Sequence, residues 1–240
     1  MACLVRFYHL LDQLSDRICG TRVLAELKNY RGWPQRGVYF FFEPSELRSD
    51  SGEGLRVVRI GTHALTAGAK STLVQRLRQH RGNASGDGNH RGSIFRLLIG
   101  QALLARNGSL HCPSWGVKGD KGKACRALGI DRDALDAVEG PVERAVSAHI
   151  NAMPFIWLNV DDEPGRDSIR SIIEQNAIAL LSNYEGPSID PPSTGWLGLR
   201  SNRDLVRKSG LWNQRHVTET HDSAFLDVFE LLVTKNENSQ

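Results

Sequence analysis

Two short runs near the start of the chain, residues 38–42 and 55–60, are rich in aromatic and β-branched residues. The polar stretch 43–54 separates them, an arrangement that predicts an antiparallel hairpin. A third run of the same kind, 155–160, ends at the turn-forming residues 161–165. These runs predict a chain of the α/β (α+β) class with a small central sheet, antiparallel or mixed.

Apolar residues recur at helical spacing on either side of these runs. The most regular segment follows Asp167, the expected N-cap, and places Ile169, Ile173 and Leu180 on one face. Further helices are predicted within 3–29 and at 71–80, 93–104, 133–138, 142–152, 202–208 and 222–233. A Gly/Pro break is predicted at 31–34 and a long loop at 107–129. We therefore expect helices to flank the sheet.

Composition limits the class of protein. The 240 residues are 40% hydrophobic, enough for one sizeable core or two small ones. No apolar run approaches the roughly 18 residues of a membrane span, and the N-terminus lacks a signal-peptide pattern. The four cysteines include no CxxC pair, which argues against a disulfide framework or a zinc ribbon. We expect a cytoplasmic protein with reduced thiols and no membrane partner.

The charge is unevenly distributed. The formal net charge is +3, but residues 76–126 alone carry ten Lys/Arg against two Asp, a net +8. Such a segment is typical of proteins that neutralise phosphates, although a solvated charged surface has the same composition. The candidate nucleic-acid contacts in and around it are Arg78, Arg81, His90, Arg91, Arg96, Lys118, Lys121 and Lys123.

An ordered set of short motifs points to a family. Gly37-Val38-Tyr39 is followed by Arg59-Ile60-Gly61, then by Arg76 and His80 one helical turn apart, and much later by the helix 174–180. The set resembles the GIY-YIG nuclease superfamily over about residues 36–185. The helix that opens with Glu174 is similar to the catalytic helix of the bacterial excision-repair incision subunit and of GIY-YIG restriction endonucleases. The resemblance implies a nuclease domain at 34–185 with an insertion at about 84–150, between helical extensions at 1–33 and 186–240.

The resemblance also implies a role for each motif residue. Glu174 would bind a single divalent metal, Mg²⁺ with Mn²⁺ as an alternative, because one carboxylate with waters and phosphate suits a hard cation. Arg76 would hold the scissile phosphate, and His80 would orient the nucleophile or bond a phosphate oxygen. Tyr39, on the face of its strand opposite Val38, would position or deprotonate the attacking water.

Two positions depart from the family pattern. Arg59 stands where the second motif normally has tyrosine, and it cannot act as a general base because it stays protonated. His63, two residues beyond the motif, is a candidate for the missing proton transfer, or else an ordinary loop histidine. The asparagine that usually follows the glutamate helix has no clear equivalent, and Asn183 is preferred over Asn176.

The predicted function is Mg²⁺-dependent endonucleolytic cleavage of DNA, with a homodimer as the form that would cut both strands. One alternative is a nucleic-acid-binding module that lost catalysis when arginine replaced tyrosine at position 59. Another is a protein-interaction domain on a nuclease-like framework, with its binding surface at Trp196 and Trp212.

Overall fold

A computed structural model of the chain describes residues 1–27, 32–108, 111–165 and 167–235. Its elements in chain order are α1 (Ala2–Arg17), β1 (Arg22–Val23), η1 (Leu24–Glu26), β2 (Gly37–Leu47), β3 (Leu55–Gly61), α2 (Leu73–Arg81), η2 (His90–Gly92), α3 (Ile94–Arg106), α4 (Lys121–Leu128), α5 (Arg132–Asn151), β4 (Pro154–Asn159), α6 (Ile169–Leu181), η3 (Leu197–Arg200), α7 (Asp204–Ser209) and α8 (Phe225–Lys235). No helix within these ranges is long and apolar enough to cross a membrane.

The four strands form one antiparallel sheet in the order β1-β4-β2-β3, so β3 lies at an edge. The predicted hairpin is present as β2 and β3, with Tyr39 directly opposite Gly61. β4 pairs along the other side of β2, with Tyr39 opposite Trp157. The predicted fold class is confirmed, and the sheet is antiparallel throughout.

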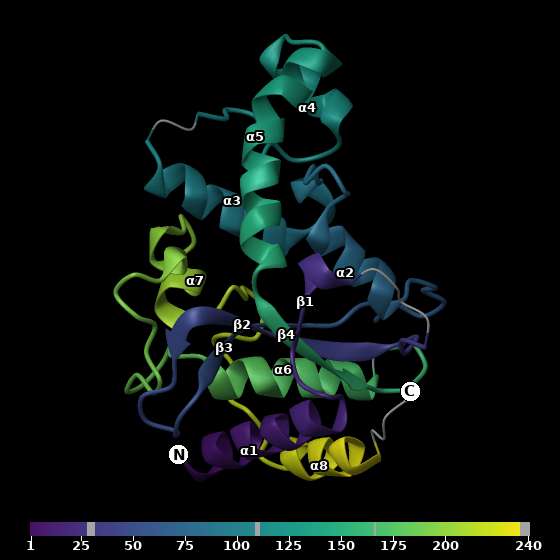
Figure 1. Cartoon of the computed structure of the whole chain (residues 1–240), viewed down its shortest axis with the longest axis vertical. Helices are drawn as coiled ribbons and strands as arrows, with labels where there is room; N and C mark the ends of the chain where they lie inside the picture. Colours follow the sequence, from purple (N-terminus) through teal and green to yellow (C-terminus); the bar gives the residue numbers. More distant parts are fainter. Residues whose placement is uncertain (28–31, 109–110, 166, 236–240) are drawn as a thin grey trace.

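Helices cover both faces of this sheet (Figure 1). α1, α6 and α8 pack on one face, where their apolar side chains meet Val38 and Phe40 of β2. α2, α3 and α5 pack on the other, together with Tyr39 and Phe41. The predicted alternation along β2 is therefore confirmed, because successive side chains of a strand point to opposite faces. Both terminal extensions contribute to these cores.

The helix N-caps show why two helices begin where the sequence predicts. Thr72 caps α2 in a capping box, accepting from the Gln75 backbone N–H while the Gln75 side chain accepts from that of Thr72. Ser93 caps α3 through the Arg96 backbone N–H. α2 and α3 thus start at positions set by local sequence, and Arg76 and His80 fall one turn apart on α2.

Two predictions for residues 107–152 were wrong. The stretch 107–129 is not all loop: α4 lies within it, between the N-cap Asp120 and a left-handed Gly129. The helices expected at 133–138 and 142–152 are one helix, α5, which continues through Pro141. Four buried side chains, Leu135, Val142, Val146 and Ile150, anchor α5 on both sides of the proline. Tertiary packing therefore offsets the roughly 3 kcal/mol that an interior proline costs.

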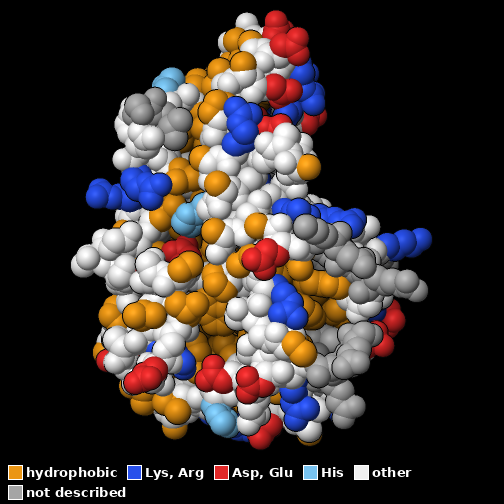
Figure 2. All heavy atoms as spheres, in the orientation of Figure 1, with side chains coloured by type: hydrophobic (Ala, Val, Ile, Leu, Met, Phe, Trp, Pro, Cys, Tyr) orange, Lys and Arg blue, Asp and Glu red, His pale blue; other side chains and the backbone are white. Residues whose placement is uncertain are grey.

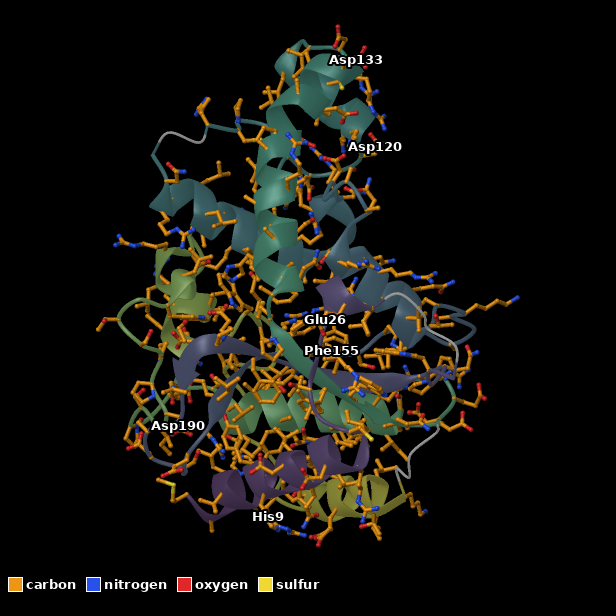
Figure 3. All side chains as sticks on the ribbon, in the orientation of Figure 1. His9, Glu26, Asp120, Asp133, Phe155 and Asp190 are labelled. Carbon is orange, nitrogen blue, oxygen red and sulfur yellow. The ribbon has the colours of Figure 1, made fainter. Side chains whose placement is uncertain are left out.

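Other boundaries differ by a few residues. α6 begins after Ser168, one residue later than the expected cap, and α8 begins at Phe225. The predicted break at 31–34 includes Arg31, and the predicted loop includes residues 109 and 110; these three lie outside the described residues. α4 and the first half of α5 project from the body of the molecule, where Asp120 and Asp133 are labelled in Figure 3.

Candidate active site

One hollow, of about 640 Å³, joins four elements that are distant in sequence. It lies where β3 ends, beside α2 and α6 and under a segment that follows α7. Its lining contains four of the predicted site residues, Arg59, His63, Arg76 and Glu174. It also contains the polar run 213–216 of the C-terminal extension, which includes Asn213 and His216.

Glu174 is the carboxylate of this hollow. It lies on α6 beside the apolar stripe formed by Ile173 and Ala177, and its Oε1 accepts the Thr62 backbone N–H at 3.2 Å. Burial raises the pKa of Glu174, and the opposing charges of Arg59 and other cations do not cancel that effect. Among the described residues no salt bridge involves Glu174. Its charge is therefore incompletely compensated, a state that a bound cation would relieve.

Three arginines line the hollow, and two of them, Arg76 and Arg59, are predicted site residues; the third is Arg215. Arg76 is half-buried on α2, and its Nη1 donates to the Gln79 side chain at 2.9 Å and to the Gly92 carbonyl at 3.2 Å. Arg59 is buried, and its Nη1 donates to the Trp212 carbonyl at 2.7 Å. The Arg59 Nε–H has no hydrogen-bond partner among the described residues. Both guanidiniums keep their positive charge beside the hollow, because neither can lose its proton.

His63 lines the same hollow and has one buried ring nitrogen without a partner among the described residues. Its Nε2 lies 3.2 Å from the Gln35 carbonyl, which can only accept, so we assign the hydrogen to Nε2. In the neutral ring Nδ1 is then an acceptor, and it has no partner within the described part of the chain. Burial, reinforced by the charge of Arg170, lowers the pKa of His63 to about 4. At neutral pH the ring is therefore uncharged, and Nδ1 is an acceptor.

A buried arginine fixes the loop that carries His63. Arg170, on α6, forms an ion pair with Asp162 and donates to the carbonyls of His63 and Ala64. Burial alone would raise the pKa of Asp162, but hydrogen bonds from Ser168 and Arg170 outweigh it and hold that pKa below its usual value. The loop is thus attached to the helix that bears Glu174.

Tyr39 and His80 do not line the hollow. Both are fully buried, and the Tyr39 hydroxyl lies 2.9 Å from His80 Nε2, while His80 Nδ1 lies 2.8 Å from the Ser93 hydroxyl. Burial lowers the pKa of His80 well below its usual value, so the ring is neutral. Gly61 makes room for the pair, since a Cβ there would stand 2.2 Å from the Tyr39 oxygen. These residues form a buried chain of hydrogen bonds connecting β2, α2 and α3.

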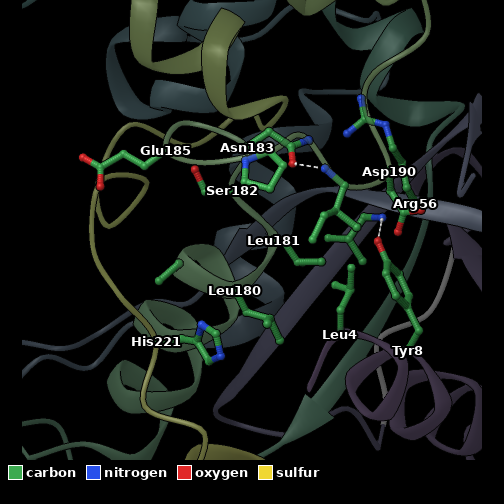
Figure 4. A pocket seen from close by; sticks show the side chains of 14 residues that line it. Leu4, Tyr8, Arg56, Leu180, Leu181, Ser182, Asn183, Glu185, Asp190 and His221 are labelled. Atoms are coloured by element: carbon green, nitrogen blue, oxygen red, sulfur yellow. Dashed lines mark hydrogen bonds between the residues drawn. The ribbon is translucent and has the colours of Figure 1, made fainter. Parts of the chain in front are cut away.

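Asn183 lies in a different hollow. Its Oδ1 accepts the Ile189 backbone N–H at 2.8 Å, and it lines a hollow of about 230 Å³ together with Tyr8, Asp190 and His221 (Figure 4). The structure therefore does not bring Asn183 to the carboxylate, because α6 ends at Leu181 and the chain then turns away from the sheet edge.

Asn213 and His216 were missed by the sequence analysis. Asn213 is buried beside β3, where its Oδ1 accepts the Ile60 N–H at 3.1 Å and its Nδ2 donates to the Ile60 carbonyl at 2.9 Å. His216 lies three residues further on, with its Nδ1 2.9 Å from Glu219. The polar string after Trp212 was the available signal, but no spacing rule connects residues 213–216 to β3.

Three of the predicted nucleic-acid contacts bind acidic side chains within the protein instead, which contradicts their assignment as DNA contacts. Arg96 is 0% exposed and donates to the Glu143 carboxylate through Nε at 3.0 Å. His90 is buried against the same carboxylate, with Nδ1 at 2.9 Å. Arg91 binds both oxygens of Glu139, at 2.7 and 2.8 Å. Arg96 and His90 have almost no exposed surface with which to contact DNA, and the Arg91 side chain is 8% exposed with its guanidinium held by Glu139. These residues fasten η2 and α3 to α5.

The other basic candidates lie at the surface. Lys118, Lys123 and Arg78 are exposed, whereas Lys121 forms an ion pair with Asp136 and Arg81 donates to the Leu27 carbonyl at 2.9 Å. Basic and acidic side chains are intermingled where α4 and α5 project (Figure 2). The +8 of residues 76–126 is therefore divided between internal ion pairs and surface charge.

A comparison with known families supports the resemblance that the motifs indicated. The GIY-YIG domain family matches the chain over residues 1–239, which includes both terminal extensions. Comparisons with curated proteins and with solved structures gave no match. The family is one of nucleases, and the hollow brings together a carboxylate, three arginines and a neutral histidine. The chain belongs to the GIY-YIG domain family and hence to a class of nuclease-type enzymes.

Proposed function

We propose that this protein is a Mg²⁺-dependent endonuclease that hydrolyses phosphodiester bonds of DNA in the hollow at the end of β3. The observation that carries the proposal is the position of Glu174, which shares this hollow with Arg59, Arg76 and His63. Hydrolysis needs positive charge on the phosphoryl oxygens and a group that takes a proton from the attacking water. These residues supply both.

The carboxylate fits a hard divalent cation. Glu174 has one oxygen bound to the Thr62 amide, incompletely compensated charge and access to the hollow. The described residues hold no cluster of three His, Cys, Asp or Glu, so water and phosphate oxygens would complete the coordination. Once bound, Mg²⁺, or Mn²⁺ in its place, would stabilise the negative charge that develops on the phosphoryl group.

The remaining steps belong to side chains of this protein. Arg76 and Arg59 grip the scissile phosphate through guanidinium donors that stay charged. His63 accepts the proton of the attacking water at Nδ1, while its Nε2–H stays on the Gln35 carbonyl. Tyr39 acts indirectly, because its hydroxyl supports His80 and the packing of α2, which carries Arg76.

Glu174→Gln is the direct test. Plasmid and single-stranded DNA are incubated with the wild type and the variant in Mg²⁺, in Mn²⁺ or in EDTA. The variant keeps the shape of the side chain but removes its charge, so cleavage should fall by about 10²–10³ or more while DNA affinity is nearly unchanged. Glu185→Gln, an exposed glutamate of the other hollow, is the matched control. Undiminished cleavage by Glu174→Gln would refute the assignment of the metal ligand.

The same assay decides between this proposal and a module that only binds nucleic acid. The rival is favoured by Arg59 in place of tyrosine and by the full burial of Tyr39, which leave the hollow without a tyrosine hydroxyl. Binding of DNA without cleavage in every metal would establish the rival.

Cleavage of both strands would require two hollows, so we propose a homodimer on duplex DNA. The free cysteines fit the reducing cytoplasm.

A further inference from the structure

The segment that follows α7 is fixed against the edge strand β3. The Trp212 backbone N–H donates to the Val58 carbonyl at 2.7 Å, and Arg59 donates to the Trp212 carbonyl. Asn213 continues the pairing through its side chain, which bonds both the N–H and the carbonyl of Ile60. Residues 211–213 therefore close this edge of the sheet and deliver the next residues to the hollow.

His216 is held in an unusual conformation beside Glu174. Its φ is +63°, a left-handed value that is uncommon for non-glycine residues. Its Nδ1 lies 2.9 and 3.0 Å from the two oxygens of Glu219. Glu219 also accepts from the Gln175 side chain at 2.8 Å, and Gln175 is the neighbour of Glu174 on α6. The carboxylate of Glu219 thus ties the imidazole to the catalytic helix.

The orientation of the His216 ring leaves its Nε2 free to contact the substrate. A carboxylate only accepts, so Nδ1 carries a hydrogen, and no described residue forms a hydrogen bond with Nε2. The His216 side chain is 28% exposed, so a bound strand can reach it. The charged groups around it are Glu219, Glu174, Arg59, Arg76 and Arg215, and no hydrogen bond joins it to Glu174.

Hydrolysis also requires a proton for the departing oxygen, and the other residues of the hollow do not supply it. Arg59 and Arg76 retain their protons. The Tyr39 hydroxyl is fully buried against His80. The Nε2–H of His63 is bound to the Gln35 carbonyl, and its ring carries no second proton at neutral pH. Among these groups His216 alone combines a titratable ring nitrogen without a hydrogen-bond partner among the described residues with access to the hollow.

We propose that His216 is the general acid of the reaction, and that Glu219 is its positioning residue. As the water oxygen forms its bond to phosphorus, the bond from phosphorus to the leaving oxygen breaks and its electron pair stays on that oxygen. The Nε2 proton of His216 transfers to it, giving a hydroxyl end and a neutral imidazole. The water proton goes to His63 Nδ1. The inference rests on the proposed nuclease function.

A substrate with a better leaving group separates this role from a structural one. Single-turnover cleavage is measured on an oligonucleotide with its normal linkage and on two others in which sulfur replaces one or the other bridging oxygen. A thiolate leaves without protonation, since a thiol pKa is about 8.5. His216→Asn suits the position because asparagine tolerates the left-handed region. His221→Gln, in the other hollow, is the matched control.

We expect His216→Asn to cleave the normal linkage about 10²–10⁴-fold more slowly than the wild type. With sulfur at the leaving position the deficit should shrink to about tenfold or less, and Glu219→Gln should show a smaller loss that sulfur also relieves. Equal rates for His216→Asn and wild type on the normal linkage would overturn the inference and leave the nuclease function standing, as would a deficit that sulfur does not relieve. Inactivity of the wild type on every substrate would overturn both.

Discussion

Arg96→Met should cost about 3–5 kcal/mol of folding free energy and leave the affinity for DNA unchanged. The Arg96 side chain is completely buried, and its guanidinium donates to the Glu143 carboxylate, to the His80 carbonyl at 2.8 Å and to the Ser147 hydroxyl at 3.0 Å. Burial alone would raise the pKa of Glu143, but His90 and Arg96 outweigh it and hold that pKa below its usual value. The carboxylate is therefore charged at neutral pH.

The size of this loss of folding free energy follows from the Glu143 charge that the substitution leaves uncompensated. Methionine fills much of the volume of the arginine stem, so little of the cost comes from a cavity. Glu143, 5% exposed, would keep only His90 as a partner for its charge. Leaving one charge of a buried pair uncompensated accounts for the 3–5 kcal/mol. For a chain of this size the loss corresponds to a fall in Tm of about 6–20 °C.

The assay is urea unfolding followed by circular dichroism at pH 7, with DNA affinity measured at a temperature where all variants are folded. Arg106→Met, at the exposed end of the same helix, is the control and should change stability by less than about 0.5 kcal/mol. Glu143→Gln keeps an acceptor for the His90 N–H but removes the charge. In that background Arg96→Met should cost at least about 1 kcal/mol less than it does alone. A wild-type unfolding midpoint for Arg96→Met, or weaker DNA binding by the folded variant, would refute the reasoning.

Two further predictions concern His63 and the surface lysines. Because the pKa of His63 is lowered to about 4, the unfolded chain binds a proton that the folded chain does not as pH falls from 6.5 to 4, and stability is lost over that window. Between pH 7 and 4 the His63→Gln variant should lose about 3 kcal/mol less unfolding free energy than the wild type, as measured by urea unfolding. If the unfolding free energies of the two proteins change in parallel with pH, the assignment is contradicted. The exposed Lys118 and Lys123 remain candidates for phosphate contacts. Replacing both with Ala should reduce the slope of log affinity against log salt by about 1.8 for duplex DNA, whereas an unchanged slope would identify them as ordinary surface charges.

Local sequence predicted those parts of the fold whose determinants are local. The hairpin of β2 and β3 and the starts of α2 and α3 follow from alternation, a capping box and an N-cap serine, all of which act within a few residues. α5 was predicted as two helices because Gly140 and Pro141 weaken the helix locally. What keeps α5 continuous is burial against α3 and the ion pairs of Glu139 and Glu143. Those forces come from residues about 40 to 50 positions away, which no local pattern contains.

In the candidate site, too, some features follow from the sequence and others from tertiary packing. The order of the motifs along the chain, from Gly37 through Arg76 to Glu174, was sufficient by itself to identify the family, because these residues stand on strands and helices whose positions the sequence predicts. Tertiary structure alone decided which side chains share the hollow. It buried Tyr39 and His80 between β2 and α2, paired Arg96 with Glu143, and brought Asn213 and His216 to Glu174 from about 40 residues away. The physical reason is that burial and charge pairing are set by which surfaces meet on folding.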